Sequence, residues 1–214
     1  DPSFHGGELP VGPSAIAAKG HVSLLRPERP YPTPRPLTTD EVVGVVEAFR
    51  KGAENAKAAG FDGVEIHGAN GYLIDQFLQD GSNQRTDPYG GPIENRARLL
   101  LEATDAAISV WGADRVGVHL APRADGHSMG DSNLPATFGY VAKALGERKI
   151  SFVSAREHEA ADSLGPALKA AFGGVYIANE KFDRDSANAA IAAGKADAVA
   201  RKLESNLERK RAQQ

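Results

Sequence analysis

The sequence contains no cysteine among its 214 residues, which excludes disulfide bonds, thiolate metal sites and cysteine nucleophiles. A cysteine-free chain is compatible with the reducing cytoplasm, and we expect the protein there. No apolar run approaches the ~18 residues of a membrane-spanning helix, and we expect no signal peptide in the opening residues. The 25 basic residues nearly balance the 28 acidic ones. This balance gives no general attraction to nucleic acids or anionic membranes.

Short motifs of common nucleotide-binding and hydrolytic sites are also missing. The chain has no GxGxxG, no P-loop, no GxSxG and no HExxH. Its six histidines are scattered without the spacing of metal ligands, so we expect no metal site.

Proline divides the chain into two parts. Residues 1–38 hold eight of the 13 prolines, which remove backbone donors and restrict the residue before them. We expect this Pro/Gly-rich segment to be an irregular excursion, with at most a short hairpin near residues 16–24. Regular structure begins at Thr38, which is spaced from Glu41 as in a helix capping box.

Residues 39–200 alternate between apolar stripes of helical period and short apolar runs, which indicates an α/β fold of βαβ units. About five strands are expected. That number suits a flavodoxin-like open sheet, because a complete (β/α)₈ barrel has eight. The expected strands are 63–66, 115–122, 150–155, 173–179 and 196–200; the expected helices are 38–60, 92–112, 134–145, 162–172 and 184–193. Residues 201–214 carry five basic and two acidic residues, and we expect a solvated basic helix or, alternatively, a partner-binding one.

The densest polar stretch follows the expected strand that ends at Ile66. His67, Asn70 and Tyr72 come next, at the carboxyl end of a strand, where α/β folds bind ligands. If a helical turn starts there, His67 and Asn70 point the same way and form a two-donor clamp. Such a clamp stabilises negative charge on a carbonyl, nitro or phenolate oxygen, and Tyr72 is a candidate proton donor. The alternatives are a structural histidine, an Asn-Gly turn and a core tyrosine.

Other candidates depend on weaker patterns. His119 lies inside an expected strand and either faces a barrel interior or is buried and neutral. Gly173-Gly174 before a strand and Ala178-Asn179 after it suit either a phosphate site or a turn. A salt-bridge network at a helix start is the expected use of Asp87, Glu94, Arg96 and Arg98.

One segment of the chain is far more specific. FDGVEIHGANGYLIDQFLQDGSNQRTDPYGGPIENRARLLLE, residues 61–102, resembles the old yellow enzyme family of flavin-dependent ene-reductases. The resemblance is carried by His-x-x-Asn-x-Tyr, SNQRTDPYGG and ENRAR, and it extends more loosely over residues 1–200. It implies a (β/α)₈ TIM barrel that holds FMN at its C-terminal face. It also implies NAD(P)H as reductant and activated alkenes such as enones, nitroalkenes and maleimides as substrates.

The same resemblance implies roles for single residues. His67 and Asn70 would bind the activating group of the alkene, and Tyr72 would protonate the α-carbon. His119 stands where the family usually has an arginine that contacts the flavin. Ala178 and Asn179 fall where backbone amides approach the FMN phosphate.

The chain departs from the family at both ends. The family's first three strands have no counterpart here, nor does the Phe-Gly-Arg segment whose arginine binds phosphate, and we assign no such role to Arg201. We therefore expect an incomplete barrel over residues 39–200, with about five strands. An open barrel exposes strand edges, so we expect self-association or a complementing barrel fragment as partner.

Two other functions stay open. One is a non-catalytic truncated or engineered barrel fragment that folds or self-assembles without flavin. The other is a different phosphate-ligand barrel enzyme, such as an aldolase or isomerase. Against a Schiff-base enzyme, four lysines fall outside the expected strand ends: Lys57, Lys143, Lys149 and Lys169.

Overall fold

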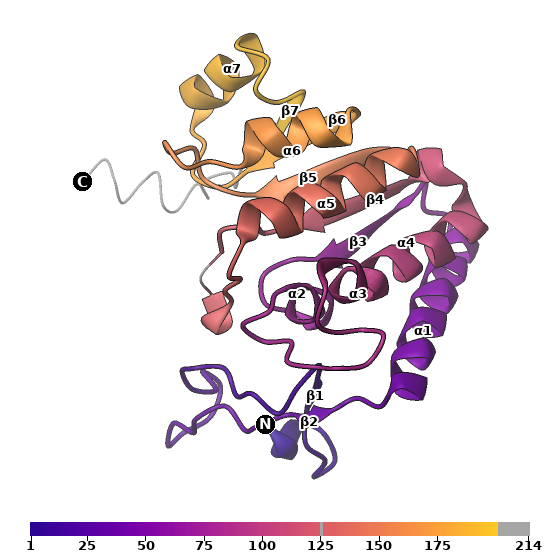
Figure 1. The fold of residues 1–214 in the computed structure, drawn as a ribbon, viewed down its shortest axis with the longest axis vertical. Coiled ribbons are helices and arrows are strands. Elements are labelled where there is room, and N and C mark those ends of the chain that lie inside the picture. The colour runs from indigo at the N-terminus through magenta and orange to yellow at the C-terminus, as the bar shows by residue number, and fades with distance from the viewer. Residues whose placement is uncertain (125, 201–214) are drawn as a thin grey trace.

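The computed structural model describes residues 1–124 and 126–200. Five parallel strands form one sheet in the order β3-β4-β5-β6-β7, which is also their order along the chain (Figure 1). A doubly wound open sheet reverses its strand order at a switch point, whereas a (β/α) barrel keeps consecutive strands as neighbours. The structure therefore confirms the incomplete barrel and not the flavodoxin-like sheet. The strands are β3 (Val64–Gly68), β4 (Val116–Leu120), β5 (Phe152–Arg156), β6 (Val175–Asn179) and β7 (Ala198–Ala200).

One face of the sheet is covered by helices. Side chains alternate between the two faces of a strand, and the register partners Ile66, Val118 and Val153 are buried on the covered face. Figure 1 shows α4, α5 and α6 lying over that face. The long helices are α1 (Thr39–Ala58), α4 (Arg98–Trp111), α5 (Leu134–Glu147), α6 (Gly165–Phe172) and α7 (Arg184–Ala192). The capping box of Thr38 and Glu41 is present at the start of α1.

Two short helices differ from the sequence-based expectation. The helix expected over residues 92–112 is two helices, α3 (Ile93–Arg96) and α4, which separate at Ala97. Helix α2 (Leu73–Leu78) was not expected, because six residues are too few to show a helical apolar stripe. Three 3₁₀ turns complete the helical elements of the described residues: η1 (Pro2–Phe4), η2 (Ala113–Arg115) and η3 (Gly126–Ser128).

No helix within residues 1–124 and 126–200 lies over the other face of the sheet. This face carries His67 of β3, His119 of β4 and Ser154 of β5 at one level, because these residues are register partners. Glu65 and Val175, nearer the other end of the strands, are exposed on the same face. In a closed barrel this face is the interior, so here the barrel interior is open on one side.

The proline-rich segment is held against α2 and the loop after it. Its two short strands, β1 (Val11–Gly12) and β2 (Arg35–Pro36), pair in parallel. The expected hairpin at residues 16–24 is absent, and the antiparallel bridge found there joins His21 to Pro30. Arg85 of the SNQRTDPYGG motif donates to the carbonyl oxygens of Pro13 and Leu37. This motif therefore attaches the excursion to the barrel.

The expected basic helix at 201–214, and with it Arg201, lies outside the described residues. Within the described part of the chain, no helix is both long and apolar enough to span a membrane.

Candidate active site

His67 lies inside a strand and not beyond it. Strand β3 continues through Gly68, so the helical turn expected to align His67 with Asn70 is absent, and α2 begins only after Tyr72. The expectation was wrong here because the apolar run that predicted the strand ends at Ile66. His67 and Gly68 are not part of that run, yet they still pair with β4. His67 is exposed on the open face of the sheet.

Three aromatic rings follow one another at this end of the sheet. The ring of His67 meets the ring of Tyr72 edge to face, with centroids 5.4 Å apart. On its other side His67 meets His119 in the same way, with centroids 5.3 Å apart. The structure thus places three of the sequence-predicted site residues in one row. Tyr72 stands at the outer end, with 60% of its surface exposed.

His119 is the most deeply placed member of the row. Burial lowers the pKa of its imidazole to about 4, and the neighbouring charges of His67 and Arg156 act in the same direction. The ring is therefore neutral at physiological pH. Its Nε2 atom is buried and has no hydrogen-bond partner among the described residues. A buried polar atom of this kind costs about 1–3 kcal/mol unless another molecule satisfies it.

Asn70 is fixed by its neighbours on three sides. Its backbone has φ 59°, a left-handed conformation that asparagine tolerates better than most residues. Nδ1 of His127 lies 3.0 Å from its carbonyl oxygen, and Nη1 of Arg156 donates to its Oδ1 at 2.8 Å. The next N–H, of Gly71, donates to Oδ2 of Asp75 at 2.9 Å.

Asp75 supports this loop from beneath. It is fully buried, and besides the Gly71 N–H it accepts a 2.7 Å hydrogen bond from the side-chain amide of Gln79. Burial raises the pKa of its carboxyl group to about 6, and the two hydrogen bonds offset only part of that effect.

A cavity of about 270 Å³ opens beside Tyr72. It lies between the proline-rich segment and the loop after β3, and its walls are mainly apolar, with contributions from Val11, Ile16, Tyr31 and Met129. His127 also lines it, with its ring 6.1 Å from the ring of Tyr72. Segments far apart in the sequence thus form one recess next to the aromatic row.

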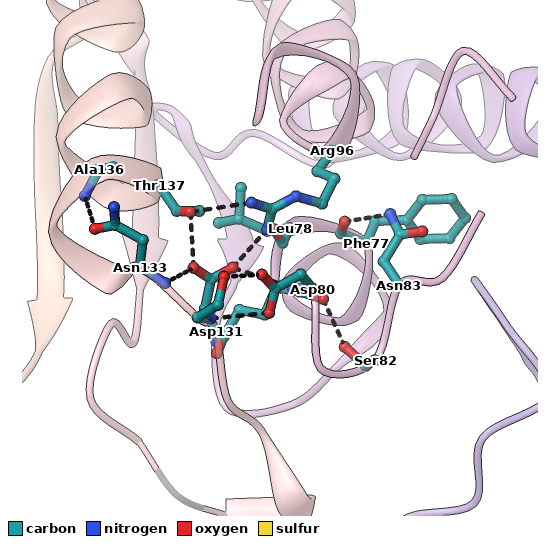
Figure 2. Close-up of polar contacts among 12 residues, drawn as sticks. Phe77, Leu78, Asp80, Ser82, Asn83, Arg96, Asp131, Asn133, Ala136 and Thr137 are labelled. Carbon is teal, nitrogen blue, oxygen red and sulfur yellow. Dashed lines mark hydrogen bonds and ion pairs between the residues drawn. The ribbon is translucent and has the colours of Figure 1, made fainter. Parts of the chain in front are cut away.

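The arginines of the ENRAR motif do not form the salt-bridge network that was expected at the helix start. Figure 2 shows Arg96 and Asp131 pointing toward each other, with Thr137 at the start of α5 beside them. Arg96 also donates to the carbonyl oxygen of Leu78 at 2.6 Å. Asp87 pairs with Arg85 instead, and Arg98 bonds to Asn95 and a backbone carbonyl. The motif therefore joins α3 to the loop before α5.

Asp131 is held in its charged form by this surrounding. Desolvation pushes the pKa of its carboxyl group upward, but the N–H groups of Asn133 and Asp80 and the side chain of Arg96 outweigh it. The pKa consequently lies below its usual value. Both members of the Arg96–Asp131 pair are almost completely buried, at 6% and 0% side-chain exposure.

Ala178 and Asn179 lie at the carboxyl end of β6, at the same edge of the sheet as the aromatic row. The carbonyl oxygen of Asn179 accepts from the N–H of Glu157 at 2.9 Å. Their contact with a phosphate stays a prediction. No group of three or more His, Cys, Asp or Glu that could hold a metal is present within residues 1–124 and 126–200.

Sequence analysis missed three residues around the site: Arg156, Glu180 and His127. Arg156 is the last residue of β5, one beyond the expected strand, and its guanidinium bonds to Asn70 and Glu180. An arginine at the carboxyl end of a strand was the available signal for it. His127 lies 57 residues from Asn70, and no local pattern connects the two.

Comparison with known proteins places this geometry in a family. A model of the "NADH:flavin oxidoreductase / NADH oxidase family" matches residues 6–206. The chain is 42% identical over 200 residues to a Leishmania infantum protein described as "Probable flavin mononucleotide-dependent alkene reductase", with 88% of this chain and 54% of that protein covered. It is 41% identical over 181 residues to 12-oxophytodienoate reductase 2 of Arabidopsis thaliana, with 81% and 48% covered.

Solved structures agree with the fold. An old yellow enzyme homologue from Zymomonas mobilis superposes with a TM-score of 0.87 at 36% identity, covering 93% of this chain and 58% of that one. Morphinone reductase in complex with tetrahydroNAD gives a TM-score of 0.84 at 39% identity, covering 91% and 55%. The chain spans about half the length of the curated relatives named here. With the family model matched over most of its residues, the chain belongs to the NADH:flavin oxidoreductase / NADH oxidase family, whose old yellow enzyme members share its fold.

Proposed function

We propose that this chain carries the substrate-binding and proton-donating part of an FMN-dependent ene-reductase that uses NAD(P)H to reduce activated alkenes. The observation that carries the proposal is the row of rings in which Tyr72 contacts His67 and His67 contacts His119. This row extends from the exposed phenol of Tyr72 to a half-buried imidazole on the inner face, that of His119. It is suited to a substrate that lies between a cofactor and solvent.

One feature of the site residues supports FMN binding. The buried Nε2 of His119 has no partner among the described residues, and a neutral imidazole can donate there to an acceptor on the flavin ring. Ala178 and Asn179, at the end of β6, would lie toward the phosphate. FMN, when bound, supplies the hydride that reaches the alkene, after it has been reduced by NAD(P)H.

The chain's own residues have three tasks in this reaction. His67 and Asn70 donate hydrogen bonds to the carbonyl or nitro oxygen of the substrate and stabilise the negative charge that develops on it. Tyr72 gives its phenolic proton to the α-carbon, because its exposed ring lies beside His67 and can reach the same molecule. The apolar recess next to Tyr72 takes the hydrocarbon part of the substrate.

A second reading is a barrel fragment that folds or assembles without flavin. The open inner face favours it, because Glu65 and Val175 stand exposed where a closed barrel would cover them. Self-association or a complementing fragment would cover that face. A cytoplasmic location stays a prediction from the cysteine-free composition.

One preparation separates the two functions. The protein is purified, its visible spectrum is recorded with and without added FMN, and reduction of 2-cyclohexenone is followed with NADH and with NADPH. The ene-reductase function requires bound flavin absorbance and turnover with one of the two nicotinamides. A colourless protein that takes up no FMN would favour the flavin-free fragment.

A further inference from the structure

Arg156 connects two loops at the carboxyl edge of the sheet. It is the last residue of β5 and lies two positions beyond Ser154, so its side chain leaves the strand on the same face as His119. Nη1 donates to Oδ1 of Asn70 at 2.8 Å, and Nη2 donates to Oε1 of Glu180 at 3.1 Å. The three residues belong to the ends of three different strands or the loops after them.

The guanidinium decides which way the Asn70 side-chain amide faces. Arginine has only donors, so the amide atom that meets it must be the oxygen. With Oδ1 toward Arg156, the NH₂ group of Asn70 faces the other way. No group within residues 1–124 and 126–200 accepts a hydrogen bond from that NH₂, so both of its protons are available to a bound molecule.

The backbone of Asn70 is fixed independently of Arg156. His127 lies in hydrogen-bond contact with its carbonyl oxygen, and the Gly71 N–H is bound to Asp75. Rotation of the Asn70 side chain is therefore the main freedom left, and the hydrogen bond from Arg156 removes it. The Arg156 side chain is itself 40% exposed, and its ion pair with Glu180, which is 22% exposed, limits its own motion.

We propose that Arg156 is a positioning residue, held by Glu180, that turns the Asn70 carboxamide so that its NH₂ group faces the substrate. The proposal rests on the proposed function for the identity of the substrate oxygen, but the orientation itself exists in the protein without ligand. It assigns the donor that Asn70 presents. The positioning role also gives a reason for the presence of the Arg156 guanidinium, on β5, beside the two histidines of β3 and β4.

The orientation can be measured without cofactor or turnover. In ¹⁵N-labelled protein, the side-chain NH₂ signal of Asn70 is identified by its loss in Asn70→Ala, and its ¹H–¹⁵N heteronuclear NOE reports whether the amide is ordered. We expect a high NOE in the wild type and a marked loss in Arg156→Gln. Glu180→Gln should give a smaller loss, and Arg156→Lys should retain part of the order because lysine still donates.

A matched control is Arg115→Gln. Arg115 is an exposed arginine just before β4, at the amino-terminal edge of the sheet, whereas Arg156 lies at the carboxyl edge. Backbone amide spectra verify that each variant folds. If Arg156→Gln does not fold, Glu180→Gln tests the proposal in its place. An unchanged NOE for the Asn70 amide in the folded variant would overturn it.

A second readout follows the charge of Arg156. His119 is faced by His67 from β3 and by Arg156 from β5. Arg156→Gln removes a positive charge that lowers the pKa of His119, so the NMR titration of His119 should shift to higher pH. Arg156→Lys keeps the charge and should leave the titration near the wild-type position. A titration that is identical in Arg156→Gln would show that the guanidinium does not lie over this face.

In the flavin-loaded enzyme, Arg156→Gln should lower kcat/KM for an enone by about tenfold to a hundredfold, the usual effect of a misplaced hydrogen bond to developing charge. The same change in an Asn70→Ala background should cost little more, because the arginine acts through Asn70. Equal losses in both backgrounds would contradict the positioning role. Absence of turnover in the wild type would remove the proposed function but leave the two NMR results to decide the role of Arg156.

Discussion

His67 and His119 face each other across neighbouring parallel strands, with ring centroids 5.3 Å apart and an interplanar angle of 71°. They are direct register partners in the β3–β4 ladder. The pairing is therefore a consequence of the sheet, and the two imidazoles lie side by side on one face, with His67 exposed and His119 half-buried. The first prediction follows from this difference in burial.

We predict that His119 titrates at about pH 4 in the folded protein and near 6.5 in urea. Burial lowers its folded-state pKa, so the unfolded chain binds the proton more readily between these values. Its contribution to stability is present above pH 6.5 and is lost as the pH falls toward 4. NMR titration of the histidine ring signals, assigned with His119→Gln, measures it. A folded-state pKa near 6.5 would show that the ring is solvated.

For Tyr72→Phe, we expect alkene reduction to slow by about 10²- to 10⁴-fold, the usual contribution of a positioned proton donor. Reduction of the flavin by NAD(P)H should stay unchanged, because that step uses no phenolic proton. Stopped-flow measurement of the two half-reactions separates them. Tyr140→Phe, on α5, is the matched control. If both half-reactions of Tyr72→Phe keep their wild-type rates, the proton comes from elsewhere.

The buried carboxyl group of Asp75 makes stability depend on pH in the opposite direction from His119. Folding raises its pKa from 3.8 to about 6, so the folded protein binds this proton more tightly. The contribution of Asp75 to the free energy of unfolding is therefore largest below pH 4 and decreases by about 3 kcal/mol as the pH rises from 4 through 6.

Urea denaturation of wild type and Asp75→Asn across this range measures the effect. The variant should lose this part of the pH dependence. Asp114→Asn, with an 83% exposed side chain, should retain it. Parallel pH profiles for wild type and Asp75→Asn would mean that folding does not shift the pKa of this carboxyl group.

The Arg96–Asp131 pair is expected to contribute to stability rather than to catalysis. Arg96→Met leaves a carboxylate of 0% exposure without its cation, and we expect a loss of about 3–5 kcal/mol in the free energy of unfolding. Arg184→Met removes an arginine from a pair that is 80% and 83% exposed, and should change stability by at most ~0.5 kcal/mol. Urea denaturation compares the two. A similar small effect for both would show that the buried pair is not a structural anchor.

Local pattern in the sequence was sufficient for the five strands of the main sheet and for the long helices. Apolar periodicity located all five strands and the five long helices, although α3 and α4 were expected as one. The HxxNxY motif predicted His67, Asn70 and Tyr72 as site residues through its resemblance to a known family, and this assignment stays a prediction. The spacing of Thr38 and Glu41 predicted the capping box, which is confirmed. These features depend on residues within a few positions of one another, so one segment of sequence contains the whole signal.

Everything that joins distant segments was decided by the tertiary structure. The ladder between β3 and β4 placed His67 inside a strand and opposite His119, and packing at the sheet edge brought Arg156 to Asn70, 86 residues away. The partner of Arg96 was likewise unforeseen, because Asp131 lies 35 residues beyond it. By itself, the sequence determined which groups this protein carries and in which elements they lie. Only the folded chain decided which of them meet, because pairing across strands depends on register and packing that no local spacing contains.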